Sequence, residues 1–299
     1  MVFKKSTSEY WRLANSIPDY PWIEKIHGLA YLRWPYLYIA TAIGTNRLGR
    51  VIEKAISLVN KVFPPRAGNP DKTSWADTYH GKVLPLKAAT ELVCVKEDIR
   101  VDDLEKIIPY KLARSIVLDH PDHIVALDCP CRAAREHPCQ PMDVCLIVGE
   151  PFASFTLEHN PKHSRTITSE EAVKILKAED ERGHEHHAIF KEAELERFYA
   201  ICNCCSCCCG AISAHLHGNP MLASSGYTAQ VNNDTCIGCG ECNDYCQFGA
   251  LSIEQGVNHV NFEKCMGCGV CTSHCNYGAI ELVLTPEKGI PLEMGVLVN

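Results

Sequence analysis

Two copies of one cysteine-rich segment constrain this 299-residue chain more than any other feature. VNNDTCIGCGECNDYCQFGALSI (231–253) is followed, 29 residues further on, by VNFEKCMGCGVCTSHCNYGAIEL (260–282). Both copies space their cysteines as C-x2-C-x2-C-x3-C and also match at their glycines. A duplication of this length predicts a unit with pseudo-twofold symmetry. The eight repeated cysteines are Cys236, Cys239, Cys242, Cys246, Cys265, Cys268, Cys271 and Cys275.

This spacing suits cubane iron–sulfur clusters that are held by thiolates. A tight loop supplies three converging thiolates, whereas the fourth cysteine, at the start of the following helix, points away and ligates the other cluster. Zinc ribbons use paired C-x2-C hooks instead, so zinc is disfavoured here. The two predicted ligand sets are Cys236, Cys239, Cys242 and Cys275 for one cluster, and Cys265, Cys268, Cys271 and Cys246 for the other.

Residues 227–284 closely resemble the bacterial two-cluster [4Fe-4S] ferredoxin. The resemblance implies two [4Fe-4S] clusters, four short strands and two helices. It also implies single-electron transfer, because a fully thiolate-ligated cubane has no open coordination position. Ferredoxins usually carry proline after the fourth cysteine, where this chain has Gln247 and Asn276. Their amide hydrogens would shift the reduction potentials, so the very low potentials of ferredoxins are not expected to carry over.

The surface expected for this unit is acidic, which suits docking to a basic redox partner. Against the single lysine Lys264, this segment carries six acids: Asp234, Glu241, Asp244, Glu254, Glu263 and Glu281.

Ten further cysteines crowd two segments of the middle region, residues 71–226. They are Cys129, Cys131, Cys139, Cys145, Cys202, Cys204, Cys205, Cys207, Cys208 and Cys209. The region is loosely similar to uncharacterised ferredoxin-bearing proteins that pair a CxCR segment with an N-C-C-x-C-C-type segment. One or two further iron–sulfur clusters are expected. Ten thiols could instead form a cubane beside a larger or atypical cluster, a cubane and a zinc site, or a dithiol pair for disulfide chemistry.

Composition points to a reducing compartment. The 19 cysteines are too few for a disulfide scaffold of this length, and MVFKKSTSEY carries no secretory signal. A cytoplasmic protein is therefore expected, and the lability of exposed clusters suggests an anaerobic setting. The formal net charge is −7, yet residues 1–70 carry ten Lys or Arg against four acids. Opposite ends of the chain would face different electrostatic partners, or each other.

Residues 1–70 are expected to form a basic, aromatic, helical extension. From Thr45 to Phe63 apolar residues recur on one helical face, and two prolines end the pattern. This helix would pack on its own domain or on a partner subunit. The alternative is a peripheral contact of residues 20–63 with the inner face of a membrane. Residues 64–72 have the composition of a linker.

Local patterns predict several elements of the middle region. Both cysteine groups are expected to follow strands, at 123–128 and 197–203. Helices are predicted at 109–120 and, from a capping box of Thr168 and Glu171, at 168–182.

Two expectations concern side chains outside these groups. HEHH (184–187) is expected to be a solvated loop, with metal binding through His184, His186 and His187 as the alternative. Cys94 is expected to be a buried core residue.

These features together predict an α+β iron–sulfur protein. Its C-terminal pseudo-twofold ferredoxin unit (227–284) follows a mixed α/β cysteine-rich domain and the basic extension, and residues 285–299 form a tail. The predicted function is the relay of single low-potential electrons between a donor and a partner oxidoreductase, as a subunit of a larger complex. The rival hypotheses are a direct substrate reductase at residues 202–209, fed by the ferredoxin unit, and a redox-sensing scaffold.

Other functional classes find no support in the sequence. It carries no phosphate-binding glycine loop at a strand–helix junction, no nucleophile–base pair and no nucleic-acid module. Flavin, nicotinamide and nucleic acid are therefore not expected as ligands, and no catalytic residue is assigned.

Overall fold

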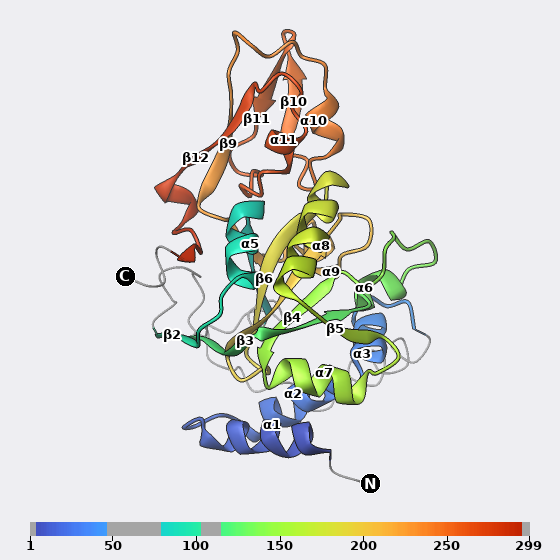
Figure 1. Cartoon of the computed structure of the whole chain (residues 1–299). Helices are drawn as coiled ribbons and strands as arrows, with labels where there is room; N and C mark the ends of the chain where they lie inside the picture. The colour runs from blue at the N-terminus through green and yellow to red at the C-terminus, as the bar shows by residue number, and fades with distance from the viewer. Residues whose placement is uncertain (1–3, 47–78, 103–114, 295–299) are drawn as a thin grey trace, which may run out of the picture.

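The computed structural model describes residues 4–46, 79–102 and 115–294 (Figure 1). Helices and mixed sheets occur together, which confirms the α+β class. Nearly all of the predicted helix at 45–63, the linker at 64–72 and the proposed boundary at residue 70 lie outside the described residues.

An eight-stranded sheet forms the centre of the middle region. Its strand order is β2-β3-β4-β7-β6-β1-β8, and β5 pairs with β3. The bounds of its strands are β1 (Tyr79–Leu84), β2 (Ile99–Asp102), β3 (Ser115–Leu127), β4 (Cys145–Glu150), β5 (Ser164–Ile167), β6 (Glu185–Lys191), β7 (Arg197–Cys204) and β8 (Leu222–Ala223). The pairs β3–β4, β4–β7 and β6–β7 are antiparallel, so the carboxyl ends of β3 and β7 meet the amino ends of β4 and β6 at one end of the sheet.

Helices cover both faces of this sheet (Figure 1). Side chains alternate along a strand, so Ile124 of β3 joins the core under α5 and α8, whereas Val125 joins the core under α1, α2 and α7. Helices α3, α6 and α9 also belong to the described part of these regions. The helix bounds are α1 (Lys5–Ser16), α2 (Trp22–Arg33), α3 (Pro35–Ala42), α5 (Leu86–Val93), α6 (Pro130–Ala133), α7 (Phe152–His159), α8 (Ser169–Glu181) and α9 (Gly210–Leu216).

The N-terminal helices share a core with the middle region. Tyr10 and Tyr20 are buried, and their hydroxyls donate to the carbonyls of Ala193 (3.2 Å) and Glu192 (2.8 Å). Within the described ranges, no helix combines the length and hydropathy that a membrane crossing requires.

The C-terminal unit lies at one end of the molecule (Figure 1). It contains the expected four short strands and two helices, in two antiparallel pairs, β9 with β12 and β10 with β11. Their bounds are β9 (Tyr227–Val231), α10 (Glu241–Asp244), β10 (Leu251–Glu254), β11 (Val257–Val260), α11 (Val270–Ser273) and β12 (Ile280–Leu284), followed by a short 3-10 helix, η3 (Pro286–Lys288).

Several local predictions are confirmed and two are wrong. The strands predicted at 123–128 and 197–203 are β3 and β7. Helix α8 begins after Thr168, whose Oγ1 accepts from the amide of Glu171 at 3.2 Å. The helix predicted at 109–120 is wrong over its described part, because residues 115–120 belong to strand β3 and residues 115–118 pair with β2. The prediction that Cys94 is a buried core residue is wrong, because Cys94 is exposed. It follows the last residue of α5, and Leu92 and Val93 at the end of that helix are the residues that are buried.

A buried arginine braces the segments that carry the middle cysteines. Arg132 is 1% exposed, and its guanidinium donates to the carboxylate of Glu179 and to the carbonyls of Pro141 and Asn203. Burial alone would raise the pKa of Glu179, but the hydrogen bond from His184 and the charge of Arg132 hold that pKa below its ordinary value. Removal of either Arg132 or Glu179 would leave the charge of the other residue uncompensated in the core.

We predict that Glu179→Gln lowers the free energy of unfolding by about 3–5 kcal/mol at pH 7. Because the pKa of Glu179 is lower in the folded protein than its ordinary value of 4.5, its carboxylate stabilises the folded state fully above pH 4.5. This stabilisation is lost as the pH falls through the pKa that Glu179 has in the folded protein. Urea denaturation at pH 7 and at lower pH measures both effects. Glu181→Gln, an exposed change on the same helix, is the control. Equal urea midpoints for Glu179→Gln and the wild type at pH 7 would contradict the prediction.

Candidate metal centres

One cavity in the C-terminal unit brings together four of the predicted ligands. Its lining includes all four cysteines of one predicted set: Cys246, Cys265, Cys268 and Cys271. Burial, together with the charge of the neighbouring thiols of Cys246 and Cys265, raises the pKa of Cys271 to about 12. Cys246, the fourth cysteine of the first repeat, therefore lies beside cysteines of the second repeat.

The other half of the unit shows the reciprocal arrangement. The pKa of Cys242 is raised by burial and by the neighbouring thiols of Cys275 and Cys239. Asn258 adds two polar contacts: its amide N–H approaches the sulfur of Cys236 at 3.4 Å, and its Nδ2 approaches that of Cys242 at 2.7 Å.

The backbone of both halves is arranged to stabilise thiolates. The amides of Ala250 and Ala279 each donate to the sulfur of the cysteine four residues earlier, at 3.2 Å in both cases. Gly238 and Gly267 have φ of +64° and +65°, and an added Cβ would lie 2.2 Å from a backbone carbonyl oxygen at each. Only glycine fits these positions. Four thiols per half with matched amide donors suit two cubane clusters.

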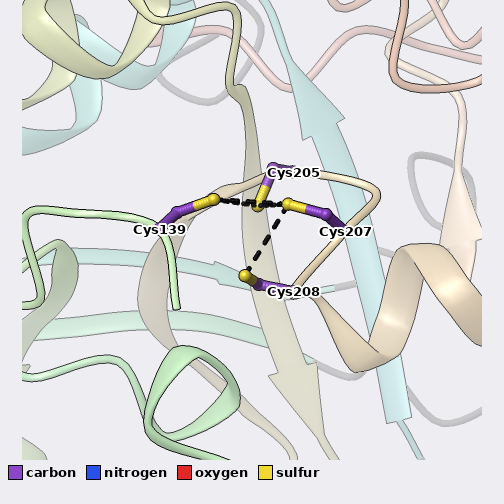
Figure 2. A group of neighbouring side chains, drawn as sticks. All are labelled: Cys139, Cys205, Cys207 and Cys208. Atoms are coloured by element: carbon purple, nitrogen blue, oxygen red, sulfur yellow. Dashed lines mark hydrogen bonds between the residues drawn. The ribbon is translucent and has the colours of Figure 1, made fainter. Parts of the chain in front are cut away.

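The middle cysteines separate into two groups. Four of them, the outer thiol group, come from two loops, and their sulfurs point toward one another (Figure 2). They all lie within 4.8 Å of one another, and four of the sulfur–sulfur distances are between 3.2 and 3.7 Å. The outer thiol group consists of Cys139, Cys205, Cys207 and Cys208.

The spacing of the outer thiol group suits a single metal ion. Thiolates about 2.3 Å from one tetrahedral zinc ion stand about 3.8 Å from each other. A cubane places four irons between its thiolates and needs a wider separation. Cys207 is exposed and Cys139 is partly exposed, so this site lies at the surface.

The other six thiols, the inner thiol group, line one small cavity of about 60 Å³, which we term the thiol cavity. The strand ends described above bring them there: β3 leads into the first two, β4 begins with the third, and β7 carries the next two. The inner thiol group consists of Cys129, Cys131, Cys145, Cys202, Cys204 and Cys209.

Hydrogen bonds link the inner thiols into a chain. Cys131 and Cys145 donate to the sulfur of Cys129 and hold its pKa well below the usual range. Cys145 and Cys204 do the same for Cys202. Six converging thiols exceed the four that a cubane requires, so the group suits a polynuclear centre.

His187 is the residue that the sequence interpretation missed. HEHH was expected to be a solvated loop, but residues 184–187 are buried and residues 185–187 begin strand β6, so that expectation is wrong. A ring nitrogen of His187 lies within 4.8 Å of the sulfurs of Cys204 and Cys209. Its Nδ1 bonds to Glu185 at 2.6 Å, its Nε2 bonds to no oxygen or nitrogen of the described residues, and the imidazole interacts with the thiol of Cys202. A carboxylate on one ring nitrogen is typical of metal-binding histidines.

The alternation of the strand explains why only one of the three histidines approaches the thiols. The register of β6 and β7 pairs His187 with Cys202 and His186 with Asn203, so these pairs point to opposite faces. His186 bonds to Asn203 at 2.6 Å, and His184 bonds to Glu179 at 2.6 Å. This period of two was the signal in the sequence that could have identified His187.

Gln247 joins the C-terminal unit to the middle region. Its Nε2 donates to the carbonyl of Gly183 at 2.7 Å, and its Oε1 accepts from the amide of Ser206 at 2.7 Å. Ser206 lies between two members of the outer thiol group. Among the described residues, Asn276 at the equivalent position of the second repeat has its side-chain hydrogen bond within the C-terminal unit, to Glu241 at 2.9 Å. The replacement of the usual proline at residue 247 thus creates a contact between the two regions.

Comparison with known proteins identifies the C-terminal unit. A family model described as a 4Fe-4S dicluster domain matches residues 235–279, so this part of the chain is a 4Fe-4S dicluster ferredoxin domain. None of the curated proteins matches the sequence. The family match does not extend to the middle region, where the two thiol groups are defined by their geometry.

We predict that Gln247→Leu weakens the contact between the regions by about 2 kcal/mol, because each lost hydrogen bond contributes about 1 kcal/mol. Amide hydrogen exchange in the loop of residues 205–209 should then rise by roughly thirtyfold. Asn276→Leu is the matched control and should leave this exchange unchanged. An equal rise in both variants would show that Gln247 does not hold the loop.

Proposed function

We propose that this chain is an iron–sulfur electron-transfer protein in which the ferredoxin unit, residues 227–284, exchanges single electrons with a second centre in the middle region. One observation carries the proposal: the two regions share an apolar cluster that contains cysteines of both. Cys204 and Cys209 of the inner thiol group pack there with Phe248 and Met266, and Cys268 of the ferredoxin unit borders the same cluster. Close, dry packing between two centres favours electron transfer over exchange with solvent.

We assign to each ferredoxin cluster the first three cysteines of one repeat and the fourth cysteine of the other repeat. The four-cysteine cavity and the proximity of Cys242 to Cys275 support it. Cluster one takes Cys236, Cys239, Cys242 and Cys275, and cluster two takes Cys265, Cys268, Cys271 and Cys246.

The surface around cluster one suits the redox partner. Cys239 is exposed, and the nearby Ile237 and Ile253 are 58% and 40% exposed. The acids expected to surround this end are exposed as well, among them Asp234 and Glu241. An exposed apolar patch with an acidic rim suits a basic partner protein. Electrons would then pass from the partner through cluster one and cluster two to the inner thiol group.

We assign different metals to the two groups of middle thiols. The outer thiol group holds a single tetrahedral ion, zinc, which ties the loop of Cys139 to that of Cys207 and takes no part in the redox chemistry. The inner thiol group holds a polynuclear iron–sulfur centre, with His187 as a further donor. The close sulfur–sulfur distances support the first assignment, and the six thiols around one cavity support the second.

We predict that the anaerobically purified full-length chain contains more than about 8 iron atoms and about 1 zinc ion. Cys207→Ser should lose the zinc and keep the iron, whereas Cys202→Ser should lose the iron beyond the ferredoxin clusters. Metal and acid-labile sulfide analysis measures both, and Cys94→Ser is the control because that thiol lies outside every group. Loss of iron in Cys207→Ser, or a wild-type protein with no more iron than two cubanes hold, would overturn the assignment.

We predict that reduction of the inner centre depends on cluster two. In Cys268→Ala, the centre should be reduced more slowly by limiting dithionite than in the wild type, as followed by rapid-freeze EPR. Cys94→Ala is the control, since that exposed thiol lies outside every group. Equal rates in Cys268→Ala and the wild type would contradict the proposed relay.

A further inference from the structure

A second, larger cavity adjoins the thiol cavity. This ligand cavity has a volume of about 340 Å³, within the range of small-molecule sites, and lies between α3 and α9. Tyr31, Ile39 and Cys131 line both cavities, so these side chains form a shared wall. A molecule in the ligand cavity would lie directly against the inner thiol group.

A buried lysine lines the ligand cavity with no acid hydrogen-bonded to it among the described residues. Lys191 is 3% exposed, and its Nζ has no hydrogen-bond partner among the described residues. The Nζ lies 3.4 Å from the ring centroid of Tyr31 and 4.5 Å from that of Tyr38, and both rings line the cavity. Two aromatic faces stabilise an ammonium but do not neutralise it, so the site favours an incoming anion.

Two acids, Glu194 and Glu24, act on Lys191 through their charge, but neither is hydrogen-bonded to its Nζ. Glu194 contributes to the electrostatic environment of Lys191, but neither of its carboxyl oxygens has a hydrogen-bond partner within the described structure. Burial raises the pKa of Glu194 well above its ordinary value, which favours the neutral acid. Burial lowers the pKa of Lys191 to about 8, so the lysine keeps its charge near neutral pH.

The remaining lining defines the rest of the ligand. Arg135 and His217 add basic groups, and the described lining contains no acidic side chain. Most of the wall is apolar and comes from Ile39, Ala42, Ile43, Ala211 and Met221. At Gly210 an added Cβ would lie 3.6 Å from Ile43 and 3.9 Å from the sulfur of Cys131, so glycine keeps the approach to that sulfur open.

We propose that the ligand cavity binds a small organic carboxylate with an aromatic or branched apolar body. The carboxylate pairs with Lys191, and the apolar body lies along α3 against Cys131. This binding site goes beyond the electron relay, because it places a small molecule in contact with the inner thiol group.

Equilibrium dialysis of benzoate against the anaerobically purified full-length protein tests the proposal. Benzoate should bind at least about tenfold more tightly than benzyl alcohol, which has the same ring and no charge. Lys191→Met should remove this preference, and Lys191→Arg should restore it. Lys87→Met changes an exposed lysine of α5 and is the control. No benzoate binding, or binding unchanged in Lys191→Met, would overturn the proposal.

Two further readouts separate binding in this cavity from binding elsewhere. Gly210→Leu fills the approach to Cys131 without touching Lys191, and should weaken benzoate binding by about tenfold or more. Benzoate should also change the EPR spectrum of the reduced inner centre in the wild type and not in Lys191→Met. Binding that persists in Gly210→Leu would place benzoate outside the cavity and overturn the proposal. Failure of these tests with the metal content and the relay intact would leave the proposed function standing.

Discussion

The middle region depends on one buried charge, the guanidinium of Arg132. Burial opposes the charged form, but the carboxylate of Glu179 and the nearby thiols of Cys129 and Cys145 stabilise it, so that the pKa of Arg132 is raised. Its donors reach the segment after β3, helix α8 and the end of β7. The segment after β3 and the end of β7 carry members of the inner thiol group, and α8 supplies the carboxylate that holds the guanidinium between them. A fixed positive charge at this point also offsets the negative charge that thiolates and iron–sulfur centres accumulate.

The contact between the two regions follows from a few residues with specific geometry. Tyr245 stacks on His274 with ring centroids 3.7 Å apart, and His274 bonds to the carbonyl of Glu181 at 3.2 Å. Gly183 ends α8 with φ +81°, and an added Cβ there would lie 2.4 Å from the ring of Tyr245. Glycine is therefore required both for the turn and for the close approach. With Gln247, these contacts hold the C-terminal unit against the middle region.

Strand β6 is a central strand that begins with buried polar residues. It begins with three fully buried polar side chains, Glu185, His186 and His187, each 0% exposed. An ordinary central strand would carry apolar residues at these positions. The polar set is tolerated because hydrogen bonds satisfy one side of each residue, whereas Glu185 Oε2 and the Nε2 atoms of both histidines lack partners among the described residues. At His187 the free nitrogen faces the thiols, which is consistent with a metal donor rather than a packing defect.

The sequence by itself determined the ferredoxin unit, because its ligands lie within short loops whose spacing encodes their geometry. It also identified the strands that lead into the middle cysteines and the cap of α8, since these depend on local patterns. It did not divide the ten middle thiols into two groups or reveal His187, Lys191 and the role of Gln247. Those features arise from contacts between segments far apart in the chain, which local periodicity does not encode. Only the tertiary structure, through strand register and the packing of the two regions, decided which thiols meet and which cavity they border.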